Sequence, residues 1–428
     1  MLMKNNKKSN IAAQLTCAAL ALPGLMQTAS AGRVEETYNA DFQYGHYEES
    51  NQRMRVDIFQ GALSAPIGKS MTANVSILRD TIAGASPQFN KKDAQGNITH
   101  SMSSASPTNW CGESICEQRD AANAGLTYFF DKASLNLGGG FSREQDYTAR
   151  YFNTALSLDL NKKLTTLNFG ASVSFDEVSP SVTNLACGDN KCSKTGQQYL
   201  LGVSQVIDKD SLLQSNITFG YHTGYMTDPY KRVGVTGDVD LGGGLILPGF
   251  STDIHEKRPE ERFEWAWLTQ YVRHFEQFNH AALHADYRFS TNDWGVNAHT
   301  LELSWHQPIA EGWQVIPRFR YYSQDKADFY QPYFNANVVI DPNIPGEQVI
   351  QNAAAYSSDY RLAGFGTFSG GLKLSKEFTE LKPLSQLKFQ TGFEYYSHKA
   401  EYQLGGNNLG TFDNFGYYLV TASFNLKF

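Results

Sequence analysis

The stretch Val420-Thr421-Ala422-Ser423-Phe424-Asn425-Leu426-Lys427-Phe428 decides the fold. Apolar and polar residues alternate along it without a break. Successive side chains of an extended strand point to opposite faces, so this stretch has one apolar face and one polar face. A helix would scatter the same residues around its axis. The stretch therefore predicts a strand that separates an apolar medium from a polar one.

The same alternation recurs along the chain, most clearly at residues 135–141, 213–221, 281–289, 301–305, 313–321 and 387–395. Most runs extend to roughly ten residues, which lets a tilted strand cross the hydrocarbon layer of a membrane. A hydrophobic fraction of 41% fits this arrangement, because half of each strand would face lipid and half water. We predict an all-β protein, a transmembrane antiparallel β-barrel of about 16 strands.

The connectors between the strands fall into two length classes that alternate. Short turns are expected near residues 65–69, 131–132, 161–163, 208–210, 277–279, 309–312 and 382–383. Long connectors are expected at 84–120, 177–195, 224–260, 324–359 and 402–414. Outer-membrane barrels have short periplasmic turns and long outer loops. Counted hairpin by hairpin, the long connectors here would all lie at one end of the barrel and the short turns at the other.

The two ends of the sequence agree with export to a bacterial outer membrane. Residues 1–31 combine three lysines, an apolar stretch and Ala29-Ser30-Ala31, which is typical of a cleaved signal peptide. Residues 32–428 would then form the barrel. The terminal Phe428, preceded by alternating apolar residues, resembles the signal read by the outer-membrane assembly machinery. We therefore expect that machinery and outer-membrane lipid as partners.

Four cysteines remain after the signal peptide, in two similar pairs: Cys111 with Cys116 and Cys187 with Cys192. An even number in an exported chain favours two disulfides, each closing a small outer loop. A metal site of four thiolates is the alternative, but the spacing is loose and no histidine lies beside either pair. We predict disulfides and no metal.

The formal net charge of −7, which becomes more negative once the three signal-peptide lysines are removed, argues against nucleic acid as a partner. No haem-attachment motif occurs, and the triplets at 138–140 and 242–244 lack the features of phosphate loops. We therefore expect no cofactor.

Charged side chains on the polar faces of the later strands are the candidates for pore-lining residues: His284, Asp286, Arg288, Glu302, Arg318, Arg320, Lys388 and Glu394. They would either select solutes or form an ion-pair network that holds the shape of the barrel. The pair His284 and Asp286 also raises the possibility of an enzyme, but no nucleophile motif accompanies it. We predict no catalytic residues.

Several motifs resemble a bacterial family catalogued as domain of unknown function 3570. They are residues 293–302, Trp313 and residues 317–330, together with 84–87, 228–231 and 357–362. The resemblance covers nearly all of the chain after the signal peptide and implies an exported, β-barrel-like protein. It also implies that such proteins are encoded near flavin-transferase and thioredoxin-like partners, which points toward an envelope redox system.

The matching residues that gather at strand ends and loops predict an outer-loop vestibule made of Asp228, Asp293, Trp294, Asp325, Asp328 and Tyr330. These side chains would either receive a ligand or partner, or pack the loops against one another.

Taken together, the sequence predicts a porin-like channel for small polar solutes. The alternative is a structural or docking barrel for an envelope redox partner in the periplasm or on a lipoprotein. An outer-membrane hydrolase is a third and weaker hypothesis.

Overall fold

A computed structural model describes residues 37–50, 54–84, 86–92, 97–103, 116–180, 190–344, 346–379, 381, 383–406, 412 and 414–428. The proposed signal peptide lies outside these residues, and so do Cys111 and Cys187. Cys192 is disulfide-bonded, but both predicted pairings stay predictions.

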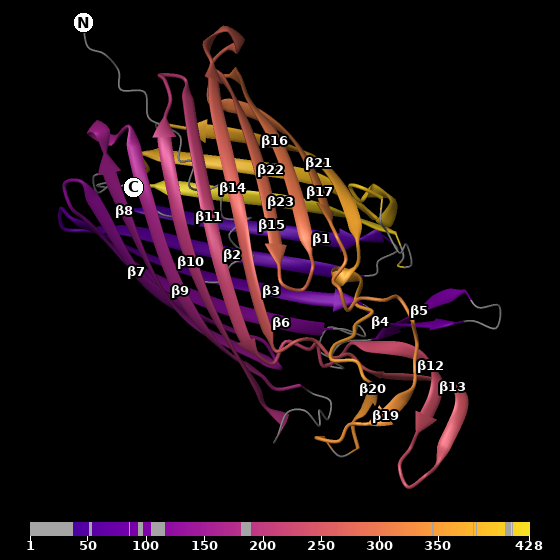
Figure 1. Ribbon diagram of the computed structural model, residues 1–428. Helices are drawn as coiled ribbons and strands as arrows, with labels where there is room; N and C mark the ends of the chain where they lie inside the picture. Colours follow the sequence, from indigo (N-terminus) through magenta and orange to yellow (C-terminus); the bar gives the residue numbers. More distant parts are fainter. Residues whose placement is uncertain are drawn as a thin grey trace, which may run out of the picture.

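Sixteen antiparallel strands form a closed barrel, as the alternation predicted (Figure 1). They are β1 (Asn39–Glu49), β2 (Met54–Ile67), β3 (Met71–Gly84), β6 (Cys116–Phe129), β7 (Ala133–Arg143), β8 (Tyr147–Leu160), β9 (Thr165–Val178), β10 (Cys192–Val206), β11 (Ser211–Gly224), β14 (Glu261–Phe275), β15 (Ala281–Asn292), β16 (Asn297–Ala310), β17 (Trp313–Gln324), β21 (Phe365–Phe378), β22 (Gln386–Lys399) and β23 (Phe415–Lys427).

The last strand closes the barrel by pairing with the first. Phe424 of β23 lies opposite Phe42 of β1, and both side chains point outward with 43% and 48% of their surface exposed. Large apolar side chains cover the outside of other strands in the same way, for example Phe152 and Leu201. Their exposure is the expected result when the medium outside the barrel is lipid.

Short connectors gather at one end of the barrel. Two of them are the 3-10 turns η4 (Asn161–Lys163) and η6 (Glu276–Phe278). The C-terminus lies at this end, and the long connectors lie at the other (Figure 1). The sorting of connectors that the sequence predicted is therefore confirmed. Among the described residues, no helix is long and apolar enough to pass through a bilayer.

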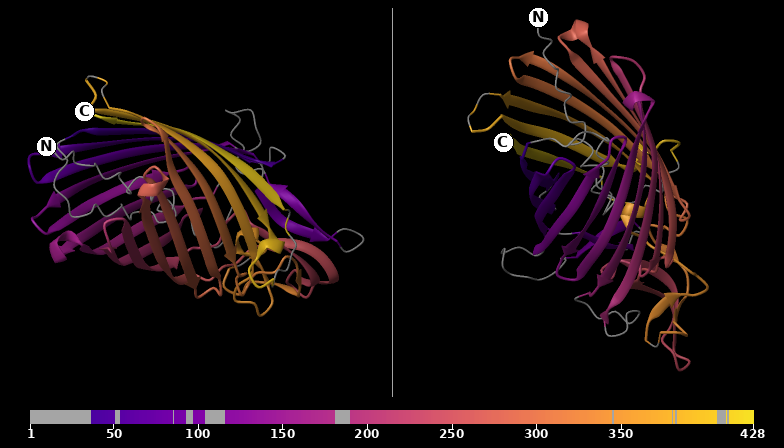
Figure 2. Two further views of the ribbon diagram at one scale, coloured as in Figure 1. Left: turned by 90° about the horizontal axis from the view of Figure 1, so that it is seen from above. Right: turned by 90° about the vertical axis from the view of Figure 1, so that its left-hand side faces the viewer.

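The long connectors contain strands of their own, which the sequence did not predict. Strands β12 (Arg232–Asp240), β13 (Ile246–His255), β18 (Phe334–Asn335), β19 (Val338–Ile340) and β20 (Gln348–Ile350) form a separate five-stranded sheet, here called the outer sheet. Strands β4 (Ser86–Lys92) and β5 (Ile98–Ser103) form a hairpin beside it. Both lie beyond the long-loop end of the barrel (Figures 1 and 2).

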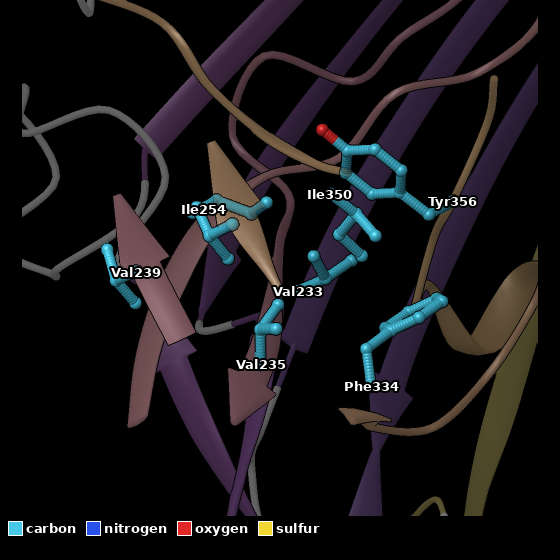
Figure 3. Packing of buried hydrophobic residues seen from close by; sticks show 8 residues of the cluster. Val233, Val235, Val239, Ile254, Phe334, Ile350 and Tyr356 are labelled. Carbon is cyan, nitrogen blue, oxygen red and sulfur yellow. The ribbon is translucent and has the colours of Figure 1, made fainter. Parts of the chain in front are cut away.

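The outer sheet has the main buried apolar cluster of the described residues. Val233, Val235, Ile254 and Tyr356 are almost completely inaccessible to solvent, and they pack with Phe334 and Ile350 (Figure 3). Because the residues come from two connectors about a hundred positions apart, this cluster fastens those connectors to each other. Two further 3-10 turns, η7 (Tyr360–Leu362) and η8 (Ala400–Tyr402), lie at the bases of the later connectors.

Candidate functional site

The lumen of the barrel has two unlike walls. Strands β6 to β11 direct mainly amides and hydroxyls inward, including Asn123, Asn136, Asn153 and Asn168, which bond to neighbouring polar side chains. Strands β14 to β22 carry most of the inward charges. The strand order places β8 and β21 eight positions apart among sixteen, so the amide wall and the charged wall face each other across the lumen.

All eight predicted pore-lining residues lie on the charged wall. Their outward neighbours confirm the face: Tyr287, Leu301, Phe319 and Phe393 are exposed on the lipid side, and alternation turns the predicted residues inward. The register brings Asp286 opposite Glu302, and Glu302 opposite Arg320. The wall is therefore a set of adjacent charges, as the sequence suggested.

Arg318 is the centre of the ion pairs on this wall. Its Nε and one terminal nitrogen each lie 2.7 Å from the two oxygens of Glu302. Its other terminal nitrogen lies 2.5 Å from Glu394. Such bidentate and charge-assisted contacts hold three strands, β16, β17 and β22, in fixed relation.

The remaining predicted residues have other surroundings. Asp286 accepts a hydrogen bond from Gln270 at 3.0 Å. The ring of His284 lies 4.3 Å from that of His306, centroid to centroid. Lys388 lies opposite Glu377, nearer the short-turn end. The enzyme hypothesis gains no support, because His284 packs against a second imidazole and not against Asp286.

The six predicted vestibule residues each bond to a neighbouring connector or strand end. Asp293 accepts from the amide of Phe263 at 3.0 Å, and the buried indole of Trp294 donates to the carbonyl of Glu261 at 2.9 Å. Asp325 accepts from Asn297 and Gln403. The amide of Asp328 donates to the carbonyl of Trp294, and the buried Tyr330 pairs with Ser357.

The absence of a side chain at Gly295 makes room for the carboxylate of Asp328. The φ of +85° at Gly295 is a conformation that favours glycine, and a Cβ there would lie 2.4 Å from the Asp328 carboxylate. The observed contacts thus fasten the outer connectors to one another. Whether these residues also receive a ligand stays a prediction.

Asp228 belongs to an ion network between two connectors, here called the latch: Asp228, Glu256, Arg258, Asp359 and Arg361. Glu256, Arg258 and Asp359 are its buried members, whereas Arg361 is about half exposed. Arg258 lies 2.7 Å from both Glu256 and Asp359. Arg361 lies 2.7 Å from Asp228 and 2.5 Å from Asp359. The hydroxyl of Ser357 donates to Glu256 at 2.5 Å.

The latch perturbs the acidity of its own members. Burial raises the pKa of Glu256, opposed by the charge of Arg258. Burial also acts to raise the pKa of Asp359, but the charges of Arg361, Lys231 and Arg258 outweigh it and hold that pKa well below its usual range. Asp359 is therefore the fixed anion of the network.

The motifs joined by the latch, residues 228–231 and 357–362, are among those that carried the family resemblance. A family model described as "Protein of unknown function (DUF3570)" matches residues 12–419. The chain belongs to this DUF3570 family. The match covers nearly all of the barrel and its connectors, so the family is a barrel family in the part that this chain represents.

Solved structures similar to this DUF3570 chain are barrels with very different sequences. OccD3 (OpdP) of Pseudomonas aeruginosa is 10% identical, with 98% of each chain covered and a TM-score of 0.42. OmpT of Vibrio cholerae is 7% identical, with 91% of this chain and 98% of the other covered and a TM-score of 0.42. The ferric enterobactin receptor PfeA of Pseudomonas aeruginosa is 9% identical at a TM-score of 0.40, over 86% of this chain, which spans only 54% of the receptor. None of the curated proteins compared matches the chain.

Sequence reasoning missed most of the latch. Glu256 and Arg258 lie in the connector 224–260 outside the motifs noted there, and Asp359 and Arg361 were noticed only as part of a family motif. A usable signal existed: charged residues that flank the apolar residues of β12 and β13 suggest ions buried in pairs.

Proposed function

We propose that this DUF3570 protein is a porin-like channel of the bacterial outer membrane for small polar solutes. The observation that carries the proposal is the closed barrel of sixteen strands with a lipid-type exterior and a mainly polar interior. Barrels of this size enclose an aqueous channel unless loops fill it.

The two-walled interior adds a reason for conduction beyond architecture. A barrel with only a structural role needs no long tract of neutral amides facing a charged wall. Amide and hydroxyl groups can replace part of the hydration shell of a passing solute, and charges on the facing wall can discriminate by sign.

The test is conductance of the purified, refolded protein in a planar lipid bilayer with potassium chloride. We expect steady ohmic steps. Replacing Arg320 with Glu should move the reversal potential toward cation preference, and this change leaves the contacts of Arg318 with Glu302 and Glu394 in place. The matched control is Arg79→Glu, since Arg79 points outward from β3, is 59% exposed and pairs with Asp120 outside the lumen. Protein that shows heat-modifiable migration but no current above the lipid background would refute the channel.

A docking barrel is the second candidate, supported by one observation. The tip of the β12–β13 hairpin exposes Leu241, Leu245, Ile246 and Phe250, all more than 40% exposed and outside the barrel. These residues suit an apolar surface of a lipoprotein at the long-loop end. Absence of conductance, together with co-purification of such a partner that is lost in Phe250→Ser, would favour docking.

A further inference from the structure

Two arginines on the charged wall differ sharply in their partners although they are two positions apart on one face of β17. Arg318 has three close contacts with carboxylate oxygens, two from Glu302 and one from Glu394. Its charge is therefore compensated by carboxylates of the barrel itself. Arg318 is the example of a structural cation in this lumen.

Arg320 has no such partner. It lies directly opposite Glu302 in the register, but both oxygens of Glu302 are held by Arg318. Among the residues that the structure describes, no carboxylate oxygen lies within 4.0 Å of Arg320 or of Arg288. Two guanidinium groups in the same region of the lumen are thus not in direct contact with a carboxylate, although the charges of Glu302 and Glu264 act on them from farther away.

Three tyrosines surround this region. Going around the barrel from Arg320, the register passes through Ser369 to Tyr396 and then to Tyr417. The rings of Tyr396 and Tyr417 are stacked, with centroids 4.3 Å apart and planes 20° from parallel. Tyr322 lies two residues along β17, and the charge of Arg320 acts on all three phenols.

The stacked tyrosines extend onto the first strand. Tyr47 lies 4.4 Å from Tyr417, centroid to centroid, and its hydroxyl donates to Glu49 at 2.5 Å. The lumen therefore has a surface of aromatic rings on β22, β23 and β1, with an unpaired guanidinium at its edge. Rings provide contact area for a flat apolar group, and their hydroxyls offer donors.

We infer that Arg320, supported by Arg288 and by Tyr322, Tyr396 and Tyr417, forms a binding site for small organic carboxylates with a planar apolar body. The planar guanidinium fork matches a carboxylate in two-point contact, as the Arg318–Glu302 pair in the next row demonstrates. The ring surface would receive the body of the solute. This site rests on the proposed channel and names the class of solute that it would favour.

The chemistry of the site separates it from general anion attraction. Lys388 is also an inward cation, but it faces Glu377 near the short-turn end, away from the tyrosines. If charge alone mattered, Lys388 and Arg320 would be equivalent. If the arrangement matters, only Arg320 should affect binding of an aromatic carboxylate.

The experiment is calorimetric titration of the folded protein in detergent with benzoate, with benzamide as the neutral isostere and acetate as the anion without a ring. We expect benzoate to bind more tightly than either. Arg320→Gln should weaken benzoate binding roughly ten- to a hundredfold, the loss expected for charge-assisted hydrogen bonds. Lys388→Gln should change it less than twofold, and Arg320→Lys should recover only part of the loss.

Each result decides the matter. Equal affinity for benzoate and benzamide, no binding of benzoate, or equal losses in Arg320→Gln and Lys388→Gln would overturn the site. Folding of each variant is checked by heat-modifiable migration, and Tyr396→Phe provides a second variant that keeps the stacked ring. Bilayer conductance with failed benzoate binding leaves the channel standing without this site, whereas binding without conductance refutes the channel.

Discussion

Replacing Asp359 with Asn should loosen the two connectors that carry the outer sheet from each other while the barrel stays folded. The side chain of Asp359 is fully buried and accepts hydrogen bonds from Arg258 at 2.7 Å and from the side chain of Arg361 at 2.8 Å. Asn keeps the acceptor for the Arg361 amide, 3.0 Å away, but not the charge. Arg258, with a side chain only 12% exposed, would then keep only one of its two anionic partners, Glu256.

The expected cost follows from this burial. Removing one partner of a buried ion pair typically costs about 3–5 kcal/mol. Arg361 adds little to this figure because its side chain is 53% exposed and water compensates it. If the connectors open locally before cleavage, their proteolysis should accelerate roughly a hundred- to several-thousand-fold.

The assay is limited proteolysis of the folded protein in detergent, with cleavage sites located by mass spectrometry. Asp238→Asn is the matched control, because Asp238 is an exposed acid on the same sheet. Unchanged cleavage within residues 225–260 and 325–364 of Asp359→Asn would refute the idea that the latch holds the outer sheet. Loss of heat-modifiable migration would show that the damage reaches the barrel.

Three other predictions concern pH, the lipid face and the cysteines. The pKa of Asp359 is lowered in the folded state, so its stabilising contribution is complete above its ordinary pKa and disappears only as pH falls through the lowered value. Protection from an acid-tolerant protease should therefore persist at about pH 5 and decline only below about pH 4. Leu201→Arg, on the outward face of β10, should destabilise the barrel in urea titrations in lipid vesicles by about 2–4 kcal/mol, whereas the inward Leu200→Arg should cost clearly less; equal effects would contradict the assigned faces. Mass spectrometry of unreduced peptides should find Cys111 joined to Cys116 and Cys187 to Cys192; cross-pairing between the two loops would show that the predicted connectivity is wrong.

The barrel could be predicted because its signal is local. Each strand alternates between lipid-facing and lumen-facing residues, and a run such as 420–428 shows this without knowledge of its neighbours. Register follows from the same alternation, since a slip of one residue would expose charges to lipid. The strand number and the inward orientation of residues such as Arg318 and Glu302 were therefore accessible from sequence.

The outer sheet could not be predicted because the pairing between its two connectors is not local, although its β12–β13 hairpin is. Val235 pairs with Phe334 and Val239 with Val338, both in parallel, and the strands β18 to β20 are two or three residues long. Such short segments carry no periodicity. Their stability comes from the buried cluster that they share with β12 and β13, which exists only after both connectors have folded together.

The distinction between Arg318 and Arg320 shows where sequence information ends for the candidate site. Both arginines follow the same alternation, so the sequence assigns both to the lumen and treats them alike. Which one is neutralised depends on the rows above and below: Glu394 lies in the row of Arg318, two strands away across Gly371, and glycine leaves the path between them open. Glu302 then turns toward the same arginine. Glycine at position 371 therefore lets Arg318 become a structural cation while Arg320 stays available to a solute. A larger residue at position 371 would crowd Glu394, and it should weaken the Arg318–Glu394 contact and so reduce the difference between the two arginines.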